Sequence, residues 1–132
     1  MSSGLWLVKA ERLLKTAMLA SDDGDADSAC NRAYYAMFNA ARAALISAGR
    51  EELAAAKTHS GLISAFGEHI VKTGFVAAEH GRALATESRR RLVGDYEGDG
   101  MALADAEMAI DHARAFIEAI TIWCATAPSS EG

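Results

Sequence analysis

The sequence predicts an all-α protein, built as an up-and-down bundle of four to five helices. Its composition favours helix, because Ala, Leu, Glu and Arg are abundant and the only Pro stands at position 128. No run of alternating Val, Ile and Thr marks a strand, whereas several segments repeat apolar residues at spacings of three and four. With 132 residues, the chain can form one core but not two, so we expect a single domain over residues 1–132. Its ends, at about 1–4 and 127–132, are expected to be frayed.

Five segments have the apolar spacing of a helix and are separated by turn residues. Asp25 is placed to cap the second segment, Thr58 or Ser60 to cap the third, and Gly49 to end the second. Gly94 is expected to break the fourth. We therefore predict helices over residues 5–20, 26–48, about 60–72, 76–92 and 102–126, with a partly mobile loop at 50–58.

The second predicted helix has two different faces. One is a stripe of mostly small residues with Tyr34 and Met37, which needs to pack against neighbouring helices. About 100° around the helix lies a second row, which we call the polar line. A solvated helix face would explain this row, but Tyr and Arg are also the residue types enriched at binding interfaces. The polar line consists of Arg32, Tyr35, Asn39 and Arg42.

Two further clusters are candidate sites. Residues 57–60 place a Lys, a His and two hydroxyls at a predicted helix N-terminus, where a phosphate or an ordinary cap would fit. The second cluster contains three arginines, which can grip phosphate, and a tyrosine, which can stack on a base. An Arg–Asp pair that fastens the chain at a helix end would explain it equally well. This cluster comprises Arg89, Arg90, Arg91, Asp95 and Tyr96.

Other kinds of chemistry have little support in the sequence. The four histidines do not form the His-x-x-x-His or Glu-x-x-His pairs that place metal ligands on one helix face, so we expect no metal site. No phosphate-binding glycine loop or serine-hydrolase elbow is present, and no cofactor is implied. The net charge of −5 argues against nonspecific coating of nucleic acid, although a local basic groove remains compatible with it. We expect a cytoplasmic protein with no membrane segment, because no apolar run approaches about 18 residues.

Several of these segments together resemble the HEPN domain proteins, in particular the small stand-alone UPF0332-like subgroup. The similarity extends in order over nearly the whole chain, and its most specific part is Arg-Ala-Tyr-Tyr-Ala-Met-Phe at residues 32–38. The resemblance implies a helical bundle that forms a homodimer and is often encoded beside a minimal nucleotidyltransferase. It also implies that many relatives are metal-independent endoribonucleases acting as toxins, while others have lost this activity. The segments are residues 31–42, 57–63, 90–96 and 116–120.

The sequence departs from the pattern of the active ribonucleases. Those proteins carry an Arg and a His separated by four to six intervening residues, and no Arg of this chain has a His at that spacing. Asp95 stands where the His is expected, directly before Tyr96. At neutral pH an Asp is a carboxylate, which repels RNA phosphate and replaces imidazole poorly in proton transfer.

Three functional hypotheses follow. The first is a HEPN-like dimer in a toxin–antitoxin or defence module, which binds a nucleotidyltransferase partner, RNA or a nucleotide. It would bind this partner through the arginine cluster, and the polar line would form the adjoining part of the binding surface. The second is a metal-independent endoribonuclease in which His59, from elsewhere in the chain, joins Arg90 or Arg91. The third is a purely structural interaction scaffold.

Overall fold

The computed structural model describes residues 2–96 and 100–126, with side chains described up to Leu92 and again from residue 100. The regular structure in these residues is helical throughout, which confirms the all-α prediction. The elements are α1 (Ser3–Asp22), α2 (Ala26–Ser47), α3 (Glu51–Ala54), α4 (His59–Phe66), the π-helical turn η1 (Gly67–Val71), α5 (Ala78–Tyr96) and α6 (Leu103–Thr126).

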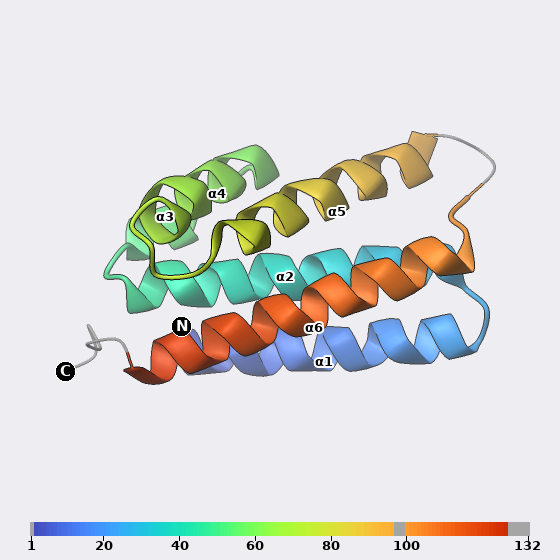
Figure 1. The fold of residues 1–132 in the computed structure, drawn as a ribbon, viewed down its shortest axis with the longest axis horizontal. Coiled ribbons are helices and arrows are strands. Elements are labelled where there is room, and N and C mark those ends of the chain that lie inside the picture. Colours follow the sequence, from blue (N-terminus) through green and yellow to red (C-terminus); the bar gives the residue numbers. More distant parts are fainter. Residues whose placement is uncertain (1, 97–99, 127–132) are drawn as a thin grey trace.

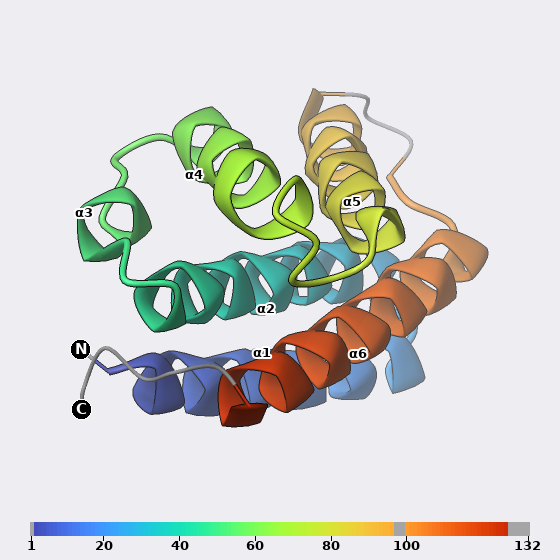
Figure 2. The same ribbon diagram turned by 60° about the vertical axis from the view of Figure 1, so that its left-hand side comes forward.

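Helix α2 is the centre of the fold. Fourteen of its 22 residues are buried, because other helices cover it on most sides. Helices α1 and α6 lie along one side of α2, and α3, α4 and α5 lie on the other (Figure 1). Figure 2 shows the same two groups from a direction 60° away. Small side chains make this close packing possible, since Ala36, Ala40 and Ala44 have no exposed surface.

A side-chain cap marks the start of α2, and a glycine with positive φ follows its end. Asp25 accepts a hydrogen bond from the Ser28 backbone N–H at 3.1 Å, which confirms the predicted cap. Gly49 follows the helix with a φ of +78°, a conformation that Gly adopts more readily than other residues. In the first turn, Asp27 accepts a hydrogen bond from the Met101 N–H at 2.6 Å. This contact fastens the segment before α6 to the start of α2.

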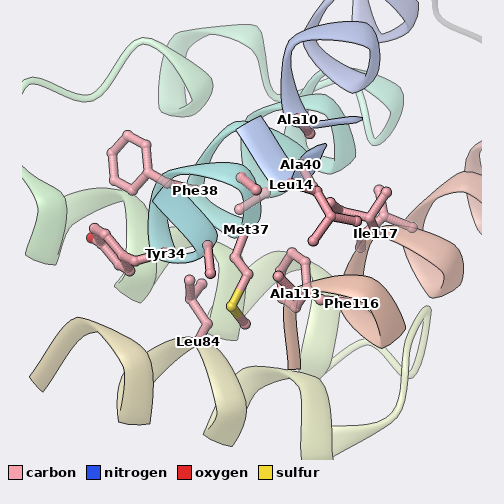
Figure 3. Close-up of a cluster of buried hydrophobic side chains, with 14 of the residues drawn as sticks. Ala10, Leu14, Tyr34, Met37, Phe38, Ala40, Leu84, Ala113, Phe116 and Ile117 are labelled. Carbon is pink, nitrogen blue, oxygen red and sulfur yellow. The ribbon is translucent and has the colours of Figure 1, made fainter. Parts of the chain in front are cut away.

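The core contains side chains from both groups of helices. Figure 3 shows Met37 of α2 between Leu84 of α5 and the α6 residues Ala113 and Phe116. The Tyr34 ring lies at the edge of the same cluster, with its hydroxyl oxygen directed away from Met37 (Figure 3). Tyr34 therefore contributes its ring to the core and its hydroxyl to a different environment.

The structure differs from the predicted elements in three places. Residues 51–54 of the expected loop form the short helix α3, in agreement with their helix propensity. The third predicted helix changes from α to π geometry after Phe66. Helix α5 continues through Gly94 to Tyr96, so the prediction that Gly94 breaks it was wrong. One glycine costs a helix only about 1 kcal/mol, which the surrounding helical residues can offset.

Candidate functional site

Local capping fixes the position of His59 at the start of α4. The Thr58 hydroxyl accepts a hydrogen bond from the Gly61 N–H at 3.0 Å, so Thr58 is the cap of this helix. A Cβ atom at position 61 would lie only 2.7 Å from that hydroxyl oxygen. Glycine at this position therefore allows the cap to form, and His59 enters the first turn of the helix facing α2.

His59 lies against a group of aromatic rings on α2. Its ring centroid is 4.7 Å from that of Phe38, 5.6 Å from that of Tyr35 and 5.7 Å from that of Tyr34. The Tyr34 oxygen lies 3.0 Å from Nδ1 of His59, which is hydrogen-bond distance. Because Tyr34 has no exposed surface, the protein interior holds this hydroxyl in place.

Arg91 of α5 reaches the same imidazole. Its Nη2 atom lies 3.5 Å from Nδ1 of His59, and its guanidinium carbon is 5.4 Å from the ring centroid of Tyr34 and 5.8 Å from that of Tyr35. Residues that are far apart in the sequence thus meet where α4 and α5 pack on α2. We call Tyr34, Tyr35, Phe38, His59 and Arg91 the His59 site.

The surroundings of the His59 site favour neutral side chains beside the arginine. Burial lowers the pKa of His59, and the positive charges of Arg91 and Arg42 lower it further. Burial also raises the pKa of Tyr34, against opposing effects from a hydrogen bond with Ser88 and the charge of Arg91. At neutral pH the site therefore combines a neutral imidazole, a neutral phenol and one guanidinium.

The three adjacent arginines of the predicted cluster lie in different environments. Arg91 is part of the His59 site. Arg90 instead donates from Nε to Glu87 at 2.8 Å and from Nη1 to Asp105 at 2.6 Å, so it joins α5 to the start of α6. Arg89 is exposed. Of the two arginines considered as partners of His59, the structure brings Arg91 to the imidazole and holds Arg90 in an ion-pair network.

The four residues of the polar line also lie in different environments. Arg42 packs between two aromatic rings, with its guanidinium carbon 4.8 Å from the Trp6 centroid and 4.7 Å from the Phe38 centroid. Tyr35 is partly buried in the His59 site, Asn39 is partly buried, and Arg32 is exposed. The four residues follow one side of α2, but only Tyr35 and Arg42 are linked to the surroundings of His59.

The structure leaves the side chains of two predicted residues undescribed, and it brings two further residues to His59. The side chains of Asp95 and Tyr96, predicted to be binding residues, lie outside the described part of the structure. Tyr34 was assigned from its spacing to the core, which is correct for its ring but missed the contact of its hydroxyl with His59. Phe38, which the sequence did not single out, also lies against His59. The signal available in the sequence was a tyrosine, a residue with a polar atom, within an apolar stripe.

Within the residues described, no group of three or more His, Cys, Asp or Glu side chains is arranged to hold a metal ion. Over the same residues, every helix is too short or too polar to cross a membrane. Surface hollows of about 320 and 410 Å³ lie between α1 and α6, and no residue of the His59 site lines them.

Comparison with known proteins identifies the family. The HEPN domain family matches residues 3–123. A UPF0332 protein of Gloeobacter violaceus is 39% identical over 90 residues, which is 68% of each chain. A protein of Methanocaldococcus jannaschii named "Putative toxin" is 31% identical over 111 residues, covering 84% of this chain and 80% of its own. A UPF0332 protein of Thermotoga maritima is 37% identical over 91 residues, covering 69% of this chain and 66% of its own. This chain belongs to the HEPN domain family.

Proposed function

We propose that this protein binds RNA through the His59 site, as a HEPN component of a toxin–antitoxin or defence module. The observation that carries the proposal is the 3.5 Å approach of Arg91 to His59 on an aromatic surface of α2. A guanidinium binds phosphate oxygens with charge-assisted hydrogen bonds, and a tyrosine ring can stack on a base. Arg91 and Tyr35 supply these two groups side by side, since the guanidinium carbon of Arg91 lies 5.8 Å from the ring centroid of Tyr35.

The sequence relationships support the biological setting of this proposal. One relative carries the name "Putative toxin". The family resemblance implies a homodimer that is often encoded beside a minimal nucleotidyltransferase. The exposed Arg32 and the partly buried Asn39 extend the surface along α2 and are available for such a partner. If the protein is only a scaffold, a captured partner will contain no nucleic acid, and Arg32→Ala will abolish its capture.

Fluorescence anisotropy with labelled single-stranded RNA tests the binding proposal. We expect Arg91→Ala and Tyr35→Ala each to weaken binding by about tenfold, in the range measured for lost stacking or phosphate contacts. Binding should also weaken as salt rises, because it depends on phosphate. Lys72→Ala removes one positive charge from an exposed side chain of another segment and is the matched control. Equal affinities of wild type, both site variants and the control would overturn the proposal.

The second candidate is a metal-independent endoribonuclease, favoured by the same proximity of His59 to an arginine. Here Arg91 would stabilise the charge that develops on the phosphate, and His59 would assist proton transfer. Incubation of the protein with RNA in the presence of a chelator tests this activity. Cleavage that disappears in both His59→Ala and Arg91→Ala would support it, whereas equal cleavage by all three preparations would identify a contaminating nuclease.

A further inference from the structure

We infer that His59 carries its ring proton on Nε2 and serves as a hydrogen-bond donor to a phosphate oxygen, with Tyr34 as a positioning residue that holds it in this form. The inference rests on the proposed function for its ligand, the phosphate of RNA. Its statement about the imidazole itself rests on the geometry around Nδ1 alone. The two parts can therefore be tested separately.

The groups around Nδ1 of His59 favour the form in which this nitrogen is bare and accepts a hydrogen bond. Arg91 approaches this nitrogen at 3.5 Å, and a guanidinium has only donors and a positive charge. A proton on Nδ1 would point toward the same region and would be repelled by that charge. The neutral imidazole that avoids this repulsion has a bare Nδ1, and its proton is then on Nε2.

Tyr34 strengthens the same assignment. Its phenol oxygen lies 3.0 Å from Nδ1. A neutral phenol has one O–H, which can donate to a bare Nδ1. Helix α2 thus presents a phenol donor, and α5 a cation, to the same ring nitrogen.

This arrangement determines what His59 can do. Neither ring nitrogen is an available base, because Nδ1 is engaged by Tyr34 and Arg91 while Nε2 carries the proton. A neutral imidazole is a very weak acid, but it can donate a hydrogen bond to a negatively charged oxygen. His59 and Arg91 together would thus form a pair of donors for phosphate. This favours binding over cleavage that depends on a histidine acting as acid or base.

Nitrogen-15 NMR of the histidine rings at pH 7.5 tests the assignment, with the His59 signals identified by their loss in His59→Gln. We expect a protonated Nε2 and a bare Nδ1 in the wild type. Tyr34→Phe removes the donor, so the Nδ1 resonance should move toward that of an unbonded ring nitrogen. Tyr35→Phe, which removes a neighbouring phenol hydroxyl, is the matched control and should leave it in place. A proton on Nδ1, or an Nδ1 resonance that Tyr34→Phe does not move, would overturn the inference.

Titration with the labelled single-stranded RNA tests the donor role in the same samples. Bound RNA should shift the Nε2–H resonance of His59 in the wild type, and the same shift should require about tenfold more RNA in Arg91→Ala. RNA that binds without changing this resonance would overturn the donor role and leave the proposed function standing. If RNA does not bind at all, the proposed function and the donor role both fail, and the ring-nitrogen measurements still decide the tautomer.

Discussion

The carboxylate of Glu87 and Nδ1 of His112 lie 2.7 Å apart in the contact between α5 and α6. Glu87 is only 1% exposed, and Arg90 donates to its other oxygen at 2.8 Å. A buried carboxylate is tolerated when hydrogen bonds and an opposite charge replace its lost hydration. The contact between these two helices therefore depends on a small polar network as well as on apolar packing.

Replacing Glu87 with Ala should destabilise the protein by about 3 kcal/mol, because Arg90 and His112 would lose their shared partner within a partly buried contact. Glu87→Gln should cost less, since the amide can still form a hydrogen bond. Urea denaturation followed by circular dichroism measures both. Glu79→Ala, on the exposed first turn of α5, is the control and should stay within about 0.5 kcal/mol of the wild type. Equal stabilities of Glu87→Ala and Glu79→Ala would contradict this role.

The adjacent arginines should have different roles, with Arg90 stabilising the fold and Arg91 binding RNA. Arg90→Ala breaks the contacts with Glu87 and Asp105, so we expect a loss of stability of about 2 to 3 kcal/mol. Arg91→Ala should mainly weaken RNA binding, and Arg89→Ala should have little effect on stability because Arg89 is exposed. Thermal denaturation and RNA anisotropy on the same three variants provide the comparison. Arg90→Ala with normal stability and lost RNA binding would assign Arg90 to the site instead.

This separation explains why the site could be predicted only in part. Arg89, Arg90 and Arg91 are consecutive on α5, so their side chains point about 100° apart around the helix. Which of them faces His59 depends on the rotation of α5 against α2, which packing determines. The sequence alone therefore identified the cluster and the pairing of His59 with Arg90 or Arg91, without distinguishing between the two.

The fold was easier to predict, because its helices depend mainly on residues that are close together in the sequence. The apolar spacing along α1, α2 and α6 and the cap at Asp25 can be read from nearby residues, and the structure agrees with them. The contact of Tyr34 with His59 joins residues that are 25 positions apart. Spacing assigned Tyr34 to the core but carried no information about the partner of its hydroxyl group.

Arg42 should stabilise the contact between α1 and α2 through its two aromatic neighbours. Its guanidinium lies between the rings of Trp6 and Phe38, and its Nε is buried with no hydrogen-bond partner among the described residues. Arg42→Ala should lower stability by about 1 to 2 kcal/mol. Arg42→Lys should recover only part of this loss, because an ammonium does not stack as a planar group.

The Trp6 fluorescence and the urea midpoint together check this prediction. Arg32→Lys is the matched control, since Arg32 also belongs to the polar line but is exposed. It should change the midpoint little. Full recovery by Arg42→Lys would show that the charge alone matters at this position and would contradict the stacking argument.

The protonation of His59 should respond to Arg91 in a defined direction. Burial and the charges of Arg91 and Arg42 lower the pKa of His59 below its usual value of 6.5. NMR titration of wild type and Arg91→Gln should show a rise of this pKa in the variant, still short of 6.5 because burial and Arg42 remain. Arg32→Gln removes an exposed charge that is not among these causes and should leave the titration unchanged. A pKa unaffected by Arg91→Gln would contradict the electrostatic coupling.

The same lowered pKa makes stability depend on pH. Because the folded protein binds a proton at His59 less readily than the unfolded chain does, the contribution of His59 is complete above about pH 6.5. It is lost as the pH falls below 6.5 and through the lower pKa of the folded state. The difference in unfolding free energy between wild type and His59→Gln should therefore shrink between pH 7.5 and 5. The other histidines are common to both proteins, so their contributions cancel in this difference. A difference that stays constant over this range would mean that folding does not lower the pKa of His59.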